Sequence, residues 1–328
     1  MRVLITGGAG FIGGHLAETV AREGHDVVVL DNFDPYYDVE LKEHTVDRIR
    51  AAATESSGTC ELVEGDVRDR ETVSTLVADT EYVFHQAAQA GVRMSVENPR
   101  KPNAINVEGT LNVLDAARNS STERVVLASS SSVYGTARYL PYDEAHPTTP
   151  VSPYGVSKLA AEGYTRVYNE VYGLPTVALR YFTVYGPRMR PNMAISNFVY
   201  RCLNGESPVV YGDGSQTRDF THVDDVVRAN RELLVTDAAD GEVLNIGSTD
   251  TIDIATLAGT IRDRLAPNLS VEYAERGRGD ADHTHASMAK ANELLGYEPT
   301  LSISEGIDSF IQWYRKNREW YEPMIERS

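Results

Sequence analysis

The sequence contains little cysteine and little lysine. Two cysteines, Cys60 and Cys202, occur in 328 residues, too few for a disulfide framework or a four-cysteine zinc site, so we expect both in the core of a protein from a reducing compartment. Lysine occurs five times against 26 arginines, and the formal net charge is −17. This excess of negative charge argues against nucleic acid, and against an anionic membrane surface, as the main partner.

Long hydrophobic runs are also missing. No stretch of 18 apolar residues occurs, and the opening MRVLITG lacks the pattern of a secretory signal, so we expect a soluble protein of the cytoplasm. The lysine-poor, carboxylate-rich composition suits concentrated salt and predicts a halophilic source; the alternative is an ordinary acidic cytosolic protein. The hydrophobic content of 41% is nevertheless enough to bury a core.

Short apolar runs alternate with amphipathic ones over the first 180 residues. Runs at 3–6, 26–30, 61–64, 82–85, 124–128 and 176–179 are typical of buried parallel strands, and 15–22, 107–118 and 157–172 have helical spacing. This alternation predicts an α/β fold, a Rossmann-type doubly wound parallel sheet. Beyond residue 180, glycine and proline interrupt the pattern, which predicts a smaller C-terminal α/β domain. We expect residues 242–246 to return to the main sheet and residues 50–58 (RAAATESSG) to form a mobile surface loop.

A glycine-rich turn follows the first predicted strand directly. Residues 3–13 read VLITGGAGFIG, in which Gly7 permits a tight turn, Gly10 permits close approach of a pyrophosphate, and Gly13 permits close packing of helix on strand. The second strand ends at Asp31, whose carboxylate suits the adenosine ribose hydroxyls and repels a 2′-phosphate. Because no arginine follows, the pattern favours NAD over NADP, although Asp31 could also be a simple turn former.

Tyrosine and lysine stand four residues apart at the start of a predicted helix. Tyr154 and Lys158 would project from one face, where an ammonium lowers the pKa of a phenol and makes it a general base toward a sugar hydroxyl. The spacing alone is weak evidence, since a surface lysine beside a half-buried tyrosine gives the same pattern. Four serines, Ser129 to Ser132, end the fifth strand, where substrates bind in such sheets.

Together these motifs resemble the extended short-chain dehydrogenase/reductase family, specifically its nucleotide-sugar epimerases. The resemblance spans nearly the whole chain, in order: residues 6–13 (TGGAGFIG), 65–67 (GDV), 85–88 (HQAA), 129–135 (SSSSVYG), 154–158 (YGVSK), 180–183 (RYFT), 218–223 (RDFTHV) and 289–296 (AKANELLG).

The resemblance implies a role for each matching residue. It implies a catalytic group of Tyr154 as base, Lys158 and Ser130. It implies NAD as cofactor, held by Gly7, Gly10, Phe11, Ile12, Gly13, Asp31, Asn32, Asp66, Val67, Ala87, Ala88, Gln89, Asn106, Ser129, Tyr154, Lys158 and Phe182. It implies a UDP-sugar substrate, held by Ser130, Ser131, Thr183, Arg190, Val210, Tyr211, Arg218 and Asp280.

The reaction class follows from a missing pair of residues. Dehydratases of this family carry Asp-Glu directly after the catalytic Ser/Thr, and its decarboxylases keep a Glu there, whereas this chain has Ser131 and Ser132. The resemblance therefore implies a 4-epimerase, in which a C4 hydride leaves and returns to the opposite face of a 4-keto sugar. The rival hypotheses are a net NAD-dependent nucleotide-sugar reductase or dehydrogenase and a non-catalytic NAD sensor.

The identity of the sugar stays open between three classes. Residues 32–42, 87–93 and 182–193 are similar to UDP-glucuronate 4-epimerases, in which the equivalents of Thr183 and Arg190 face the sugar carboxylate. UDP-glucose epimerases look similar over the same segments, although they usually have Asn in place of Thr183. Thr284 stands where some of them have a bulky Tyr, so an N-acetylhexosamine is a third possibility.

Three further expectations concern the C-terminal part and assembly. The family's late Arg-x-Gly-Asp motif is displaced here, so Arg276, Arg278 or neither accompanies Asp280, and His283 with His285 lacks the neighbours that a metal site needs. We expect residues 1–180, with a returning segment near 221–247, to bind NAD, and 181–220 with 248–328 to bind the nucleotide sugar. The family usually forms homodimers through two helices per subunit, here 107–118 and 157–172.

Overall fold

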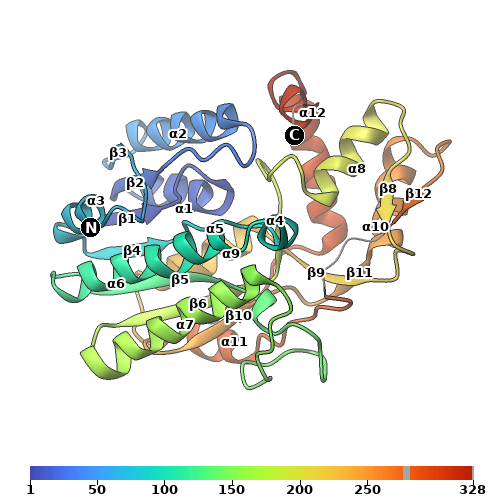
Figure 1. Ribbon diagram of the computed structural model, residues 1–328. Helices are drawn as coiled ribbons and strands as arrows, with labels where there is room; N and C mark the ends of the chain where they lie inside the picture. The colour runs from blue at the N-terminus through green and yellow to red at the C-terminus, as the bar shows by residue number, and fades with distance from the viewer. Residues whose placement is uncertain (276–280, 327–328) are drawn as a thin grey trace.

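The core of the protein is a parallel sheet. A computed structural model describes residues 1–275 and 281–326 (Figure 1). Its largest sheet has seven strands in the order β10-β6-β5-β4-β1-β2-β3, and every neighbouring pair is parallel. The strands are β1 (Arg2–Thr6), β2 (Asp26–Asp31), β3 (Thr59–Glu64), β4 (Tyr82–His85), β5 (Arg124–Ser130), β6 (Thr176–Tyr181) and β10 (Val243–Ile246). The predicted doubly wound α/β fold is confirmed, and the run at 242–246 does pair with β6.

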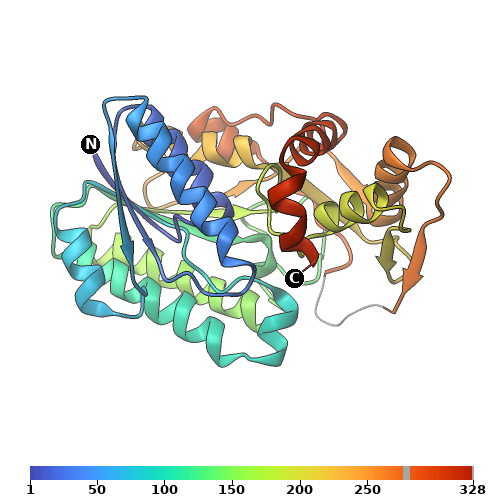
Figure 2. The ribbon, with the colours of Figure 1, turned by 90° about the horizontal axis from the view of Figure 1, so that it is seen from above.

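Helices cover both faces of this sheet (Figure 2). One layer consists of α1 (Phe11–Arg22), α2 (Val39–Thr54) and α9 (Val223–Glu232), and the other of α3 (Arg70–Ala78), α6 (Gly109–Arg118) and α7 (Pro153–Tyr172). Alternate residues of β2 serve the two layers: Val27 and Val29 pack in the cluster that includes α1, while Val28 and Leu30 pack in the cluster that includes α3 and α6. Burial on both faces explains why the interior of β2, residues 27–30, is apolar throughout.

The segments before α6 and after β5 are short helical pieces. Helices α4 (Val92–Glu97) and α5 (Arg100–Pro102) lead into a π-helical turn, Asn103–Glu108, that continues into α6. A 3₁₀ turn, Ser131–Val133, follows β5 directly. These pieces place residues 87–106 and 129–133 at the carboxyl end of the sheet, the edge where ligands bind in such folds.

The expectation of a surface loop at 50–58 is wrong for its first half. Residues 50–54 form the last turns of α2, and Ala52 and Ala53 are buried in the core beside α1. Alanine is the best helix former and packs closely, so the run of three alanines continues the helix. Only the four residues after Thr54 connect α2 to β3.

The remaining C-terminal residues form a smaller lobe on the right of Figure 1. It contains the three-stranded sheet of β7 (Thr183–Tyr185), β9 (Thr217–His222) and β11 (Thr251–Asp253), and the strand pair β8 (Val209–Tyr211) and β12 (Glu272–Ala274). Helices α8 (Ala194–Leu203), α10 (Ile254–Leu265) and α12 (Ile303–Glu326) enclose its core around Phe198 and Phe310, while α11 (Ala289–Leu295) packs on β10. Across the described ranges, none of the helices is both long and apolar enough to cross a membrane.

Candidate active site

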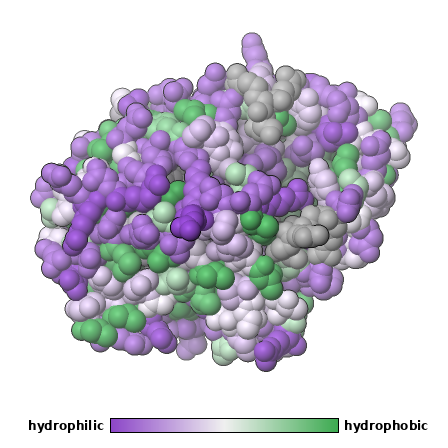
Figure 3. Space-filling model, viewed as in Figure 1, coloured by the Kyte–Doolittle hydropathy of each residue, from purple (hydrophilic) through white to green (hydrophobic). Residues whose placement is uncertain are grey.

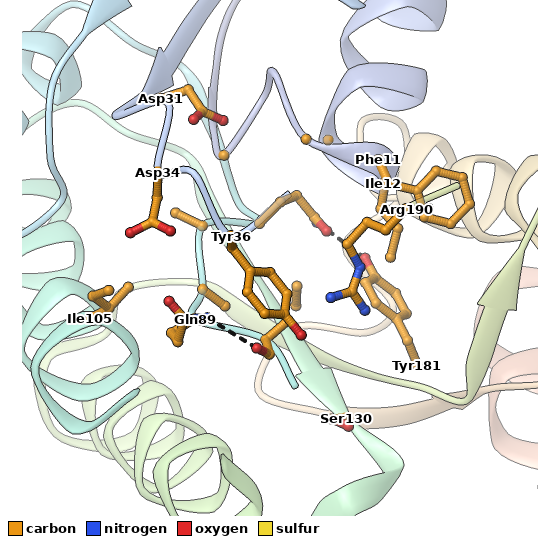
Figure 4. Close-up of a pocket in the computed structure, with 18 of the residues that line it drawn as sticks. Phe11, Ile12, Asp31, Asp34, Tyr36, Gln89, Ile105, Ser130, Tyr181 and Arg190 are labelled. Carbon is orange, nitrogen blue, oxygen red and sulfur yellow. Dashed lines mark hydrogen bonds between the residues drawn. The ribbon is translucent and has the colours of Figure 1, made fainter. Parts of the chain in front are cut away.

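A cavity of about 350 Å³ opens at the carboxyl ends of the central strands. The segments that follow β1, β2, β4, β5 and β6 contribute to its walls, and Arg190 and Met193 contribute from the smaller lobe. Figure 4 shows Asp31 and Asp34 at one end, Ser130 at another, and Tyr36 reaching across the middle toward Arg190.

The glycine turn between β1 and α1 forms one wall of this cavity. Gly7 has a left-handed backbone, with φ +67°, and a Cβ added there would lie 2.7 Å from the Ala87 nitrogen. A Cβ on Gly13 would lie 2.4 Å from the Gly7 carbonyl oxygen. Gly10 caps α1 without any side-chain hydrogen bond, so the amides of the first turn of α1 are left for an anionic ligand. The turn therefore presents backbone amides at the N-terminus of α1 with no side chain capping them.

Asp31 ends β2 and is buried, with its carboxylate held by three donors. It accepts hydrogen bonds from the backbone nitrogens of Ala9 at 3.2 Å and Phe33 at 2.9 Å, and from Lys42 Nζ at 3.1 Å. Lys42 is buried too, and it lines the cavity. Sequence reasoning missed this lysine; its rarity in a chain with five lysines was the available signal.

Tyr154 and Ser130 meet inside the cavity. Pro153 begins α7, and the Ser152 hydroxyl accepts a hydrogen bond from the Gly155 nitrogen at 3.1 Å, which caps the helix. This cap places Tyr154 in the first turn of α7, where it lines the cavity together with Ser130, the last residue of β5, whose hydroxyl lowers the pKa of the phenol. The predicted catalytic pair therefore lies in one cavity.

The expected lowering of the pKa of Tyr154 by Lys158 is wrong for this structure. Burial raises the pKa of Tyr154 above its usual value, and the hydrogen bond to Ser130 and the positive charge of Arg190 offset only part of that rise. Lys158 is buried as well and donates from Nζ to the Ala128 carbonyl at 2.7 Å. Burial lowers the pKa of Lys158 to about 8, and the neighbouring Glu162 carboxylate acts in the opposite direction.

A buried ionic network lies behind these residues. Glu162 pairs with Arg180 at 2.8 Å, and the Ser129 hydroxyl donates to the same carboxylate. Arg180 also donates to the Tyr134 hydroxyl at 2.9 Å. This network joins α7, β5 and β6, so it fixes the helix that carries the candidate base relative to the sheet.

Most of the sequence-predicted residues line the cavity together. These are Gly7, Gly10, Phe11, Ile12, Gly13, Asp31, Asn32, Val67, Ala87, Ala88, Gln89, Ser129, Ser130, Tyr154, Lys158, Phe182, Thr183 and Arg190. Six others lie outside its wall, namely Asp66, Asn106, Ser131, Val210, Tyr211 and Arg218. Asp280, with Arg276 and Arg278, lies outside the described residues.

Two of the residues outside the wall support residues inside it. Asn106 is buried, accepts from the Gln89 nitrogen at 2.8 Å and donates to the Ser157 hydroxyl at 2.8 Å, so it ties the loop after β4 to α7. Asp66 accepts a hydrogen bond from Asn32 at 2.9 Å, and its contact with Arg68 lowers the pKa of its carboxyl strongly.

Arg190 brings an unbalanced positive charge into the cavity. Its guanidinium lies 5.4 Å from the centre of the Tyr36 ring, and within the described residues no carboxylate forms an ion pair with it. Thr183, at the start of β7, lines the same cavity. An anionic ligand group is therefore the partner that this end of the cavity lacks. Sequence reasoning missed Tyr36, although it stands in the segment 32–42 that carried part of the resemblance.

The remaining predicted contacts lie in the smaller lobe. Val210 is buried in its core, while Tyr211 is 47% exposed and has the Arg93 guanidinium 4.8 Å from its ring centre. Arg218 donates to the Thr217 carbonyl at 2.9 Å and the Asp282 carbonyl at 3.2 Å. The parts of the chain that the structure describes contain no group of three potential metal ligands.

The fold and this site define a nucleotide-binding protein of the extended short-chain dehydrogenase/reductase class. Residues 4–310 match the family model described as GDP-mannose 4,6 dehydratase, and the chain belongs to that family.

Particular relatives are named as epimerases. The chain is 37% identical to a UDP-glucuronate 4-epimerase of Arabidopsis thaliana, covering 95% of this chain and 75% of that protein. The structure of a Bacillus cereus UDP-glucuronic acid 4-epimerase, in complex with UDP-glucuronic acid and NAD, is similar with a TM-score of 0.90 at 32% identity, over 96% of this chain and 99% of that one. A Thermotoga maritima UDP-glucose 4-epimerase with UDP-glucose gives 0.88 at 32%, over 97% and 100%.

Proposed function

We propose that this protein is an NAD-dependent UDP-sugar 4-epimerase that inverts C4 through a transient 4-keto sugar. The observation that carries the proposal is that Tyr154 and Ser130 line the same cavity as the glycine turn and Lys158. A protein that only senses NAD needs the glycine turn but no such pair. The relatives named as epimerases support the same conclusion.

The residues of the cavity fit NAD. The glycine turn forms a cradle that a single Cβ would fill, the N-terminus of α1 faces it, and Asp31 ends β2 at the position for the adenosine ribose. Asn32, Asp66 and Val67 lie beside Asp31 and would hold the adenine end. When held by these residues, NAD would supply a hydride acceptor and donor for C4 of the sugar.

The side chains of this chain would move the proton. The Tyr154 phenolate would accept the proton of the C4 hydroxyl, and the Ser130 hydroxyl would hydrogen-bond the same oxygen. Burial raises the pKa of Tyr154, and the positive charge of Arg190 acts in the opposite direction and favours the phenolate. After the keto sugar rotates to present its opposite face, Tyr154 would return the proton, so neither the base nor the cofactor is consumed.

Among the residues that the structure describes, the cavity lacks the groups for a dehydration. Its acidic lining residues are Asp31 and Asp34, and each is held in an ion pair, with Lys42 at 3.1 Å and Lys101 at 2.7 Å. Ser131 and Ser132 occupy the 3₁₀ turn after Ser130, where a dehydratase would need a carboxylate. Hydride removal and return is the chemistry that remains.

We propose UDP-glucuronate as the preferred sugar. A uronate carboxylate would supply the negative charge that the Arg190 guanidinium lacks among the described residues, and Thr183 could hydrogen-bond the same group. UDP-glucose is the second candidate, since a relative named for it has the same fold, and a UDP-N-acetylhexosamine is the third.

We propose that the two lobes bind different ligands. Residues 1–180 with 221–247 would hold NAD, and residues 181–220 with 248–328 would hold the nucleotide sugar. Val210 and Tyr211 would contact the base, Arg218 would contact the diphosphate, Ser131 would face the sugar, and Asp280 would contact the nucleotide ribose.

The test is direct conversion of three UDP-sugars. Purified protein is incubated separately with UDP-glucuronate, UDP-glucose and UDP-N-acetylglucosamine, and each mixture is searched for its C4-inverted product. We expect inversion of UDP-glucuronate, a loss of about 10²- to 10⁴-fold in kcat for Tyr154→Phe, and little change for Tyr168→Phe. Tyr168 is on the same helix but bonds Asp115, away from the cavity. Steady consumption of added NADH would indicate a reductase instead, and absence of turnover despite NAD binding would indicate a sensor.

We further propose a homodimer through α6 and α7. Exposed apolar side chains line the outer face of α7, including Val156, Val167, Val171 and Tyr172 at 38–65% exposure, and hydrophobic residues gather over this region in Figure 3. Two copies could bury these faces as a four-helix bundle. Val171→Asp should yield monomers in sedimentation analysis, and an unchanged mass would contradict the proposal.

The composition supports a cytoplasmic protein of a salt-rich cell. With a net charge of −17, mutual repulsion between carboxylates should weaken as salt screens it. The melting temperature should therefore rise between 0.1 M and 2 M KCl, and a flat response would contradict this proposal.

A further inference from the structure

Arg190 lies in a segment with an unusual backbone. The residues between β7 and α8 include Gly186 with φ +139° and Arg188 with φ +59°. Arginine rarely adopts a left-handed backbone, because its Cβ then crowds the following carbonyl. A conformation of this kind persists only where surrounding contacts hold it.

A buried ion pair supplies one of those contacts. Arg188 Nη2 donates to Glu18 Oε2 at 2.6 Å, and the two side chains are 5% and 7% exposed. Burial alone would raise the pKa of Glu18, but its arginine neighbours lower it to about 2. Glu18 belongs to α1, the helix that follows the glycine turn, and Arg188 precedes Arg190 by two residues. The pair therefore connects the cofactor helix to the segment that carries Arg190.

A second anchor holds the same segment from the smaller lobe. The Tyr321 hydroxyl of α12 donates to the Met189 carbonyl at 2.7 Å, and the Met189 side chain is buried. The Met193 nitrogen donates to the Arg190 carbonyl at 3.2 Å, just before α8 begins. With the backbone fixed on both sides, the Arg190 side chain reaches into the cavity, where Figure 4 shows it facing Tyr36.

We propose that the Glu18–Arg188 ion pair is a positioning device that holds the Arg190 guanidinium against the sugar carboxylate and so sets the preference for an acidic sugar. The proposal rests on the proposed function, in which Arg190 contacts that carboxylate. Arg188 itself faces Glu18 rather than substrate, so it is a positioning residue and not a catalytic one.

The test compares two arginines that share the same carboxylate. Arg188→Met removes the buried partner of Glu18, and Arg48→Met removes a half-exposed partner, which lies on α2 and bonds Glu18 at 2.7 Å. Steady-state kinetics are measured with UDP-glucuronate and with UDP-glucose, which lacks the carboxylate. If the enzyme does not convert UDP-glucose, the inhibition constant of UDP-glucose against UDP-glucuronate conversion is measured in place of KM. Arg190→Met gives the reference loss, and Arg188→Lys tests rescue.

We expect Arg188→Met to raise KM for UDP-glucuronate roughly tenfold or more while kcat and UDP-glucose binding change by less than about threefold. Arg190→Met should give the same pattern, Arg188→Lys a partial return, and Arg48→Met no change in selectivity. Where Arg188→Met does not fold, Glu18→Gln takes its place and the same pattern is expected.

Two results would overturn the proposal, and they differ from each other. Suppose that the wild type prefers UDP-glucuronate. If Arg188→Met then weakens binding of both sugars equally, or of neither, the positioning role of the ion pair is refuted and the assignment of the acidic sugar stands. A wild type that inverts UDP-glucose but not UDP-glucuronate would remove both the positioning role and the assignment of the acidic sugar.

Discussion

Replacing Lys42 with methionine should destabilise the protein through a charge left alone in its interior. Asp31 and Lys42 lie 3.1 Å apart with side chains 5% and 8% exposed. Removing one partner of a buried pair typically costs about 3–5 kcal/mol, because the remaining charge is neither paired nor hydrated. Asp31 keeps the amide donors of Ala9 and Phe33, so we expect the lower end, about 3 kcal/mol.

The chain offers a matched control for this substitution. Lys101 pairs with Asp34 at 2.7 Å, but these side chains are 33% and 25% exposed. Water screens such a pair, so Lys101→Met should cost less than about 1 kcal/mol. The assay is equilibrium urea unfolding of the nucleotide-free protein, followed by intrinsic fluorescence. Because Asp31 is also the proposed ribose ligand, NAD titration of each variant should show weaker binding for Lys42→Met alone.

A double variant separates pairing from packing. Asp31→Asn with Lys42→Met removes both charges, so most of the loss seen in the single variants should return, with a coupling free energy above about 1 kcal/mol. Equal unfolding free energies for Lys42→Met and Lys101→Met, or additive effects in the double variant, would refute the view that burial makes the Asp31–Lys42 pair important.

Three other substitutions test different parts of the structure. Gly13→Ala places a Cβ 2.4 Å from the Gly7 carbonyl oxygen and should weaken NAD binding at least tenfold in a fluorescence titration, whereas Gly259→Ala, with nothing within 4 Å, should leave it unchanged. Burial lowers the pKa of His85 to about 3, below its value of about 6.5 in the unfolded chain. The unfolded chain therefore binds more protons than the folded chain between those pH values. The free energy of unfolding falls by up to about 1.4 kcal/mol per pH unit as the pH drops below 6.5. His85→Asn should reduce this pH dependence of the unfolding free energy, measured by urea unfolding between pH 6.5 and 5. Phe310 is fully buried, so Phe310→Ala should cost about 3–5 kcal/mol in the same assay, and a loss below 1 kcal/mol would contradict its place in the core.

Local sequence patterns predicted the bounds of several strands of the central sheet well, because a buried strand is marked by its own run of apolar residues. The strand expected at 82–85 has those bounds in β4, and those expected near 3–6 and 26–30 differ from β1 and β2 by one residue at one end. Helix starts were less accurate: the stretch expected at 157–172 begins at Pro153, because the cap by Ser152 lies outside the apolar pattern. Residues 50–54, expected in a surface loop, are helical, and Ala52 and Ala53 are buried beside α1, a contact that the local sequence does not reveal.

The sequence by itself determined the nucleotide-binding turn, the alternation of strands and helices, and the Tyr154–Lys158 spacing, because each depends on neighbours within one turn or strand. Tertiary structure alone decided which charges meet. The Glu18–Arg188 pair joins residues 170 positions apart, and Lys158 donates to a carbonyl of β5 while burial raises the pKa of the phenol one turn away. The strength of such contacts depends on distance and exclusion of water, and only the packing of the two lobes sets both.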